Sequence, residues 1–147
     1  MRVSAKSEYA IRAAVHLAAV DGARTKAEDL AAAGDIPRQF LENILAELRR
    51  AGIVRAHRGS DGGYELALRA CDIDLVMVLA AVGSPLAEIE PRDNPTVARG
   101  APVDDVWLAL QSVTRGVLER ITLADLCAGS LPADVRRLAR DERARVD

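Results

Sequence analysis

The segment from Pro37 to Arg50 divides its apolar and polar residues between two faces of a helix. Its apolar residues recur at the 3.6-residue period and predict a buried face: Phe40, Leu41, Ile44, Leu45 and Leu48. A shorter helical pattern stops at Gly34, just before this segment. Two helices joined by a tight turn that contains glycine predict a helix-turn-helix, which restricts the chain to a small set of folds.

The opposite face of the same segment is polar. It carries Gln39, Glu42, Asn43, Ala46 and Arg50, with Arg38 at the edge of the first turn. Amide, carboxylate and guanidinium groups make paired hydrogen bonds with base edges in the major groove of DNA. The pattern favours a recognition helix, and the alternative is an ordinary solvated helix face.

Two further helices are predicted before this segment. The first covers residues 4–20, with Ser4 as its N-cap. Thr25 and Glu28 have the spacing of a capping box and predict the start of the second. Thr25 and Lys26 would then place backbone N–H groups and a cation at a helix N-terminus, an arrangement that suits a phosphate.

A β-hairpin is predicted directly after the helix-turn-helix. The residue pattern indicates strands over 53–57 and 64–68, joined by the glycine-rich turn 58–63. A hairpin in this position is a wing. The turn has few side chains besides Arg58, so its backbone can approach a phosphate while the arginine enters a minor groove.

The second half of the chain is predicted to form a dimer. Asp74 can cap a short helix over 75–82, and the proline-rich segment 84–102 has almost no apolar period and predicts a loop. A helix then begins whose apolar residues recur at helical spacing: Val103, Val106, Trp107, Leu110, Val113, Val117 and Ile121. A helix with this much apolar surface needs a partner, and the simplest partner is a second copy of the chain.

The segment Thr122–Leu126 has the pattern of a short helix capped at its start. A tail helix from Pro132 to about Arg145 mixes five arginines with acidic residues. Interspersed charges of both signs predict a solvated surface here and not a second nucleic-acid site.

Composition agrees with a helical protein and excludes several classes. The chain has 27 alanines and four aromatic residues, which argues against a β-sandwich or a barrel. Residues 1–70 carry 11 basic and 9 acidic side chains (+2), and residues 71–147 carry 9 and 13 (−4), so charge alone does not predict nucleic-acid coating. We expect a cytoplasmic protein with no membrane span and, because no nucleophile–base–acid arrangement is present, no enzyme.

Four stretches carry a resemblance to one family of bacterial regulators. They are Arg2–Ala10, Ile36–Glu42, Ala51–Tyr64 and Ile121–Leu126. Over about residues 1–130 the chain resembles the Rrf-two (Rrf2) family of winged-helix transcription regulators, which includes iron–sulfur-biogenesis, nitric-oxide-sensing and cysteine-metabolism repressors.

The resemblance implies a homodimer, more often a repressor than an activator, that binds a palindromic operator in double-stranded DNA. The family's base-reading positions correspond to Pro37, Arg38, Gln39 and Glu42, and its minor-groove arginine to Arg58. With the residues that the patterns themselves indicate, the predicted DNA contacts are Thr25, Lys26, Pro37, Arg38, Gln39, Glu42, Asn43, Arg58, Gly59 and Ser60.

The chain departs from the resemblance in its loop. Many relatives carry three cysteines there that ligate an iron–sulfur cluster, whereas segment 84–102 has none. Such clusters need thiolates, so we expect no cluster and no other cofactor. Cys71 and Cys127 lie outside this segment and are expected to be buried small residues. The loop remains a candidate input region for an unknown small-molecule or protein effector.

Together these features predict a mainly α fold with a small β-hairpin wing. A winged helix-turn-helix domain would cover 1–83, a flexible loop 84–102, and the dimerisation helix with the C-terminal helices 103–147. The alternative is a winged-helix protein-interaction adaptor that does not bind DNA, which the net acidic charge favours.

Overall fold

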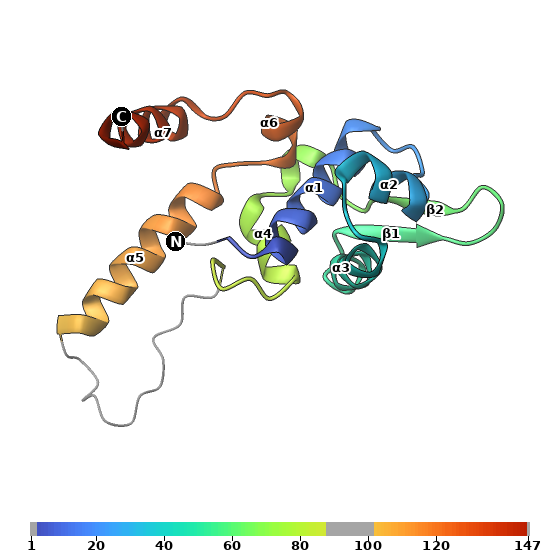
Figure 1. Ribbon diagram of the computed structural model, residues 1–147, viewed down its shortest axis with the longest axis horizontal. Helices are drawn as coiled ribbons and strands as arrows, with labels where there is room; N and C mark the ends of the chain where they lie inside the picture. Colours follow the sequence, from blue (N-terminus) through green and yellow to red (C-terminus); the bar gives the residue numbers. More distant parts are fainter. Residues whose placement is uncertain (1–2, 88–101, 147) are drawn as a thin grey trace.

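The computed structural model describes residues 3–87 and 102–146. In chain order its elements are α1 (Ala5–Ala19), α2 (Ala27–Gly34), α3 (Arg38–Arg50), β1 (Val54–His57), β2 (Gly63–Leu66), η1 (Ala70–Asp72), α4 (Leu75–Ala81), α5 (Pro102–Leu118), α6 (Leu123–Cys127) and α7 (Ala133–Val146). The helices and the antiparallel β1–β2 pair confirm the predicted mainly α fold with a small hairpin (Figure 1).

The main core lies where α1 packs against α2, α3 and α4. Small side chains at Ala10, Ala13 and Ala14 of α1 are fully buried and allow the neighbouring helices to approach closely. Four of the five residues on the predicted apolar face of α3 have no exposed surface: Leu41, Ile44, Leu45 and Leu48.

Phe40, the fifth residue of that face, does not enter the core and is 47% exposed. Its ring meets the ring of Tyr9 edge-on, with centroids 5.8 Å apart. The next residue, Leu41, is the one in the first turn of α3 that enters the core.

Three predicted N-caps are present. Ser4 accepts a hydrogen bond from the backbone of Ser7 at 3.1 Å, and Asp74 accepts one from the backbone of Met77 at 2.9 Å. Thr122 forms a reciprocal capping box at the start of α6. These caps satisfy backbone donors that would otherwise have no partner at helix starts.

The capping box predicted at Thr25 is wrong. The N-cap of α2 is Lys26, and it makes no side-chain cap hydrogen bond. Thr25 instead forms a short antiparallel bridge with Tyr64 of the hairpin, and each residue's backbone N–H donates to the other's carbonyl oxygen, at 2.9 and 2.8 Å. The backbone of Thr25 is therefore bonded to a residue distant in the sequence and does not take part in the predicted capping box.

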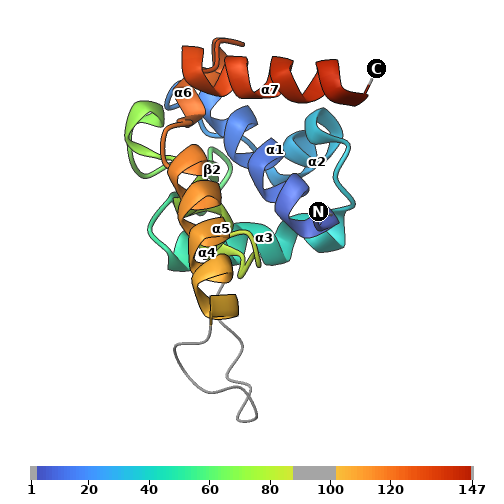
Figure 2. The same cartoon turned by 90° about the vertical axis from the view of Figure 1, so that its left-hand side faces the viewer.

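Helix α5 projects away from the body formed by α1–α4 (Figures 1 and 2). None of its residues is buried. Only its C-terminal end packs on a small second cluster, made of Leu75, Ile121 and Val135 with Val117 partly buried against it.

Most of the predicted loop, residues 88–101, lies outside the described residues. Its start is held firmly, since Ser84 is buried and accepts a hydrogen bond from the Ser7 hydroxyl at 2.8 Å. Among residues 3–87 and 102–146, no helix is long and apolar enough to cross a membrane.

Candidate nucleic-acid interface

The predicted base-reading residues share one exposed surface. Pro37, Arg38, Gln39, Glu42 and Asn43 are all exposed, at the N-terminal half of α3. They face away from the buried leucine face of the helix, so the fold leaves the first two turns of α3 available to a ligand. That is the part of a recognition helix that meets base edges in helix-turn-helix proteins.

Arg38 is held between two carboxylates on this surface. Its guanidinium lies 2.9 Å from Glu28 of α2 and 3.2 Å from Glu42 one turn further along α3. The hydrogen bond to Glu42 and the charge of Glu28 raise the pKa of Arg38. The pKa of Glu28 is lowered by a hydrogen bond with its own backbone and then by the charge of Arg38. DNA that uses Arg38 must therefore displace carboxylates from it.

The hairpin next to α3 ends in an exposed turn. Strand residue Val54 pairs with Leu66 and His57 with Gly63, which leaves the turn at the free end. Arg58, Gly59 and Ser60 are all exposed. Within the described parts of the chain Arg58 has no ion-pair partner, so its guanidinium is available to a phosphate or a minor groove.

Glycine is required where the hairpin closes against its neighbours. Gly63 has φ +145°, and a Cβ at this position would lie 2.8 Å from the carbonyl oxygen of Thr25. The Thr25–Tyr64 bridge depends on this close approach. The wing is thus attached to the start of α2 as well as to the end of α3.

Sequence reasoning missed Arg24 at this junction. Its guanidinium donates to the carbonyl oxygen of Asp61 in the wing turn at 3.3 Å. The contact joins two segments 37 residues apart, and no local pattern indicates it. Thr25, by contrast, cannot offer its backbone N–H to a phosphate because Tyr64 already accepts it, whereas Lys26 beside it is exposed.

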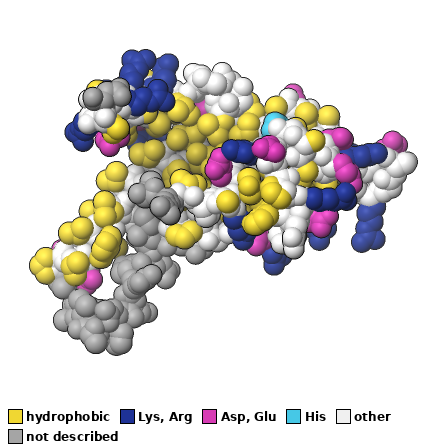
Figure 3. All heavy atoms as spheres, viewed as in Figure 1, with side chains coloured by type: hydrophobic (Ala, Val, Ile, Leu, Met, Phe, Trp, Pro, Cys, Tyr) yellow, Lys and Arg dark blue, Asp and Glu magenta, His cyan; other side chains and the backbone are white. Residues whose placement is uncertain are grey.

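A long apolar strip follows α5. Five of the seven predicted dimer residues are about half exposed or more, from 46% for Val103 to 67% for Val113: Val103, Val106, Trp107, Leu110 and Val113. Figure 3 shows this surface as hydrophobic side chains along the projecting helix. Exposed apolar surface of this extent is typical of an interaction site.

The last two residues of the predicted strip lie elsewhere. Ile121 is beyond the end of α5, is 6% exposed and packs against Leu75 and Val135. Val117 is half-buried against the same cluster. Both therefore anchor α5 to its own chain, because the helix must be attached to the body at one end.

The cysteines are exposed, contrary to prediction. Cys71 lies in the three-residue turn η1 and Cys127 is the last residue of α6, and both positions face solvent. Partial desolvation of its sulfur by the surrounding protein raises the pKa of the Cys127 thiol. Among the described residues, no three His, Cys, Asp or Glu side chains are grouped as metal ligands would be.

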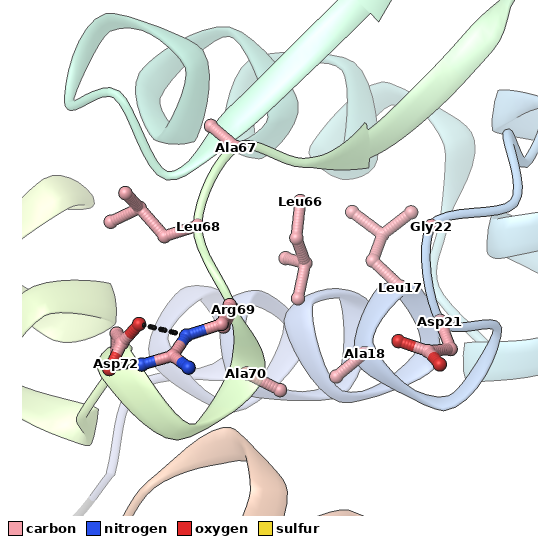
Figure 4. Close-up of a pocket in the computed structure, with 10 residues that line it drawn as sticks. All are labelled: Leu17, Ala18, Asp21, Gly22, Leu66, Ala67, Leu68, Arg69, Ala70 and Asp72. Atoms are coloured by element: carbon pink, nitrogen blue, oxygen red, sulfur yellow. Dashed lines mark hydrogen bonds and ion pairs between the residues drawn. The ribbon is translucent and has the colours of Figure 1, made fainter.

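A hollow of about 460 Å³ lies between the end of α1, strand β2 and η1 (Figure 4). Leu17, Leu66 and Ala70 give it an apolar floor, and Arg69 on its rim is paired with Asp72 at 2.7 Å. This size is common for small-molecule sites. None of the predicted DNA contacts lines it.

Comparisons with known proteins agree on one family. Residues 3–129 match the profile of Rrf2, described as an iron-dependent transcriptional regulator. A protein of Mycobacterium tuberculosis whose name describes an HTH-type transcriptional regulator, Rv1287, is 48% identical over 98% of this chain and 92% of its own length. CymR of Bacillus subtilis, also named an HTH-type transcriptional regulator, is 26% identical over 87% of this chain and 91% of its own.

Solved structures show the same fold. The structure of CymR, described as the global cysteine regulator of Bacillus subtilis, covers 88% of this chain and 98% of its own with a TM-score of 0.74 at 24% identity. The structure of T. potens IscR covers 88% of both chains with a TM-score of 0.72 at 27% identity. The winged helix-turn-helix prediction is confirmed, and nothing in these relatives supports an adaptor that avoids DNA.

Proposed function

Because this chain belongs to the Rrf2 family of DNA-binding transcriptional regulators, we propose that it acts as a homodimeric repressor that recognises a pseudo-palindromic operator. The observation that carries the proposal is the shared surface of α3 and the wing. It combines a polar helix face with an unpaired arginine on a turn, and both belong to one fixed body.

Recognition would divide between the two elements. The side chains of Gln39 and Glu42 suit an adenine edge and a cytosine amine in the major groove, respectively. Arg38 reaches guanine or phosphate once DNA displaces Glu28. Arg58 supplies a cation for the minor groove or its phosphates at the wing.

Dimerisation would use the exposed strip on α5. Packing two strips against each other removes Trp107, Leu110 and Val113 from water, which the single chain cannot do. A two-fold axis there would place the two α3 helices in successive major grooves, about 34 Å apart on one side of the duplex. The operator is then expected to have matching half-sites.

We further propose that operator binding needs no iron–sulfur cluster. The family description includes iron, but the donor set of this chain does not fit a cluster in the segment after α4. That segment has no cysteine, and Cys71 and Cys127 lie on separate elements outside it. Thiolates are the ligands that such clusters require.

The effector that regulates DNA binding would therefore be a ligand other than an iron–sulfur cluster. We propose segment 84–102 as the region that receives a small-molecule or protein effector. Its described start supports this role, since the Ser84–Ser7 hydrogen bond joins the segment to α1, and Lys6 beside Ser7 pairs with Glu47 of α3 at 2.9 Å. Deleting residues 88–101 should remove regulation in cells and leave operator binding intact. Unchanged regulation would contradict the assignment.

Fluorescence anisotropy with metal-free protein tests the function. The first duplex would be the region upstream of the protein's own gene, titrated at several salt concentrations with non-specific competitor. We expect binding that resists competitor and has a steep salt dependence. Binding that competitor removes, on this duplex and on all fragments of a genome-wide pull-down, would contradict sequence-specific recognition.

The Arg58→Ala variant tests the wing in the same titration. Loss of one phosphate contact should weaken binding and lower the salt slope by about 1. The matched control is Arg69→Ala, since Arg69 is also exposed but is paired with Asp72 away from the candidate interface. Equal affinities and slopes for Arg58→Ala and the wild type would exclude Arg58 as a contact.

A further inference from the structure

Helix α7 carries basic and acidic residues on different sides, although they are interspersed along the sequence. At 100° per residue, Arg136, Arg140 and Arg143 lie within about 60° of one another around the helix. We call these three residues the arginine stripe. The acidic residues Asp134, Asp141 and Glu142 are each about 100° or more away from every member of the stripe.

The arginine stripe is exposed and unpaired. Within residues 3–87 and 102–146, none of its three guanidinium groups has a carboxylate partner, and the same is true of the adjoining Arg137. Arg145 of the same helix does pair, 3.8 Å from Glu142, and Arg120 pairs with Asp134. The described acidic residues of α7 therefore do not pair with the stripe, and its guanidinium groups are available to an anion outside the chain.

The stripe is far from the candidate interface described above. Figures 1 and 2, viewed at right angles, both place α7 on the opposite side of α1 from α3. In Figure 3 basic side chains gather on α7 at one end of the molecule and around the wing at the other. A duplex held by α3 of one protomer therefore does not reach α7 of the same protomer.

The family's DNA-binding fold does not account for α7. The match to the family profile ends at residue 129, before α7 begins at Ala133. Val135 is the only residue of α7 that is buried, so the helix adds little to the core. A helix that contributes one buried side chain and presents an unbalanced cationic face has the properties of a binding element.

We propose that the arginine stripe binds the phosphate backbone of a second double-stranded DNA segment while α3 and the wing hold the operator. Arg136 to Arg143 spans about 10 Å of helix, and each strand of a duplex carries one phosphate every 3.4 Å or so along the helix axis, so a duplex lying against the stripe offers several phosphates over that length. One guanidinium group can donate two hydrogen bonds to two oxygens of the same phosphate. Because the phosphate backbone is the same at every base pair, this contact would not depend on base sequence.

Two duplexes labelled with different dyes, the operator and an unrelated sequence, test the proposal. Fluorescence cross-correlation counts the complexes that carry both. The triple variant Arg136→Gln/Arg140→Gln/Arg143→Gln should lose most of these complexes, and the salt slope for capture of the second duplex should fall by about 3. Operator affinity in the anisotropy titration should stay within about twofold of the wild type, since the stripe does not face α3.

Matched variants separate the effect of the stripe on DNA capture from the effect of net charge. Arg140→Gln and Arg145→Gln each remove one positive charge from α7, but only Arg140 belongs to the stripe; only Arg140→Gln should reduce capture. Far-UV circular dichroism checks that α7 remains helical. Equal capture by the triple variant and the wild type, or no capture by the wild type, would overturn the proposal. Stripe-dependent binding of polyglutamate in preference to DNA would overturn it in favour of an acidic protein partner.

The two proposals can fail separately. If the operator is not recognised but the stripe still sets the affinity for the unrelated duplex, the proposed function is wrong, and of this inference only the contact between the stripe and DNA stands. If operator binding is normal and the stripe has no effect on DNA, the reverse holds.

Discussion

Helices α3 and α5 have similar amphipathic patterns but different surroundings. The leucines and isoleucine on the apolar face of α3 have no exposed surface, whereas the strip on α5 is about half exposed or more over most of its length. The body of the chain covers one helix and leaves the other bare. Periodicity therefore predicts that a face will be buried, but it does not tell whether the covering residues come from the same chain.

The largest expected effect is on the covered helix. Leu45→Ala should lower the free energy of unfolding by about 2–5 kcal/mol, because the fully buried side chain leaves a cavity in the main core. Urea unfolding at fixed protein concentration measures this, since stability of a dimer depends on concentration. A loss below about 1 kcal/mol would show that the α3 core is not packed as described.

Substitutions on the exposed strip of α5 should change the association between chains and not the stability of the fold. Leu110→Asp should weaken the proposed dimer by roughly tenfold to a hundredfold, equivalent to about 1.4–2.8 kcal/mol, because it introduces a charge into the apolar strip. Analytical ultracentrifugation measures the change. The control is Ser112→Asp, an exposed residue of α5 on the other side of the helix. Equal weakening by both variants would mean that the strip is not the interface.

A smaller effect is expected at the exposed surface of α3. Glu28→Gln removes one of the carboxylates that hold Arg38, and it should raise operator affinity a few-fold. Asp29→Asn removes a neighbouring exposed charge that, among the described residues, makes no ion pair with Arg38, and it should change affinity less. If both variants gain equally, net charge and not the release of Arg38 explains the gain.

The smallest effect concerns the capping box of α6. Hydrogen bonds from the backbone and hydroxyl of Thr122 lower the pKa of Asp125 below its usual value near 3.8. Because the folded-state pKa is the lower one, the contribution of Asp125 to stability is present above the unfolded-state pKa and is lost as pH falls through the folded-state pKa. Urea unfolding across this acidic range should show a slightly shallower pH dependence for Asp125→Asn than for the wild type. An identical pH dependence would indicate that the cap does not stabilise the folded chain.

Local signals in the sequence predicted local structure correctly. Ser4, Asp74 and Thr122 cap helices as expected, because a cap needs only a backbone donor two or three residues away. The same holds for the order of elements through the wing. Most of the candidate interface on α3 could also be placed, since a residue opposite a leucine face is exposed wherever that face is buried.

Errors arose where distant segments decide the outcome. Thr25 has a valid capping spacing, yet Tyr64 takes its backbone hydrogen bonds. Ile121 continues the apolar spacing of α5, yet the helix has already ended and the side chain completes a separate cluster. The pairing of Arg38 with Glu28 cannot be read from the order of residues, because it depends on how α2 and α3 are oriented in space. The grouping of arginines on α7 follows from helical spacing, although basic and acidic residues are interspersed along the linear sequence.

The bridge between Thr25 and Tyr64 has a consequence for how operators can vary. With Gly63 packed against Thr25 and Arg24 bound to the wing turn, the distance between the wing and α3 is fixed by covalent geometry and hydrogen bonds. The protein could not bind a half-site in which a base pair is added or removed between the major-groove and minor-groove contacts. Operators of different length would have to differ between the half-sites, where the proposed contact between two α5 helices would be the adjustable joint.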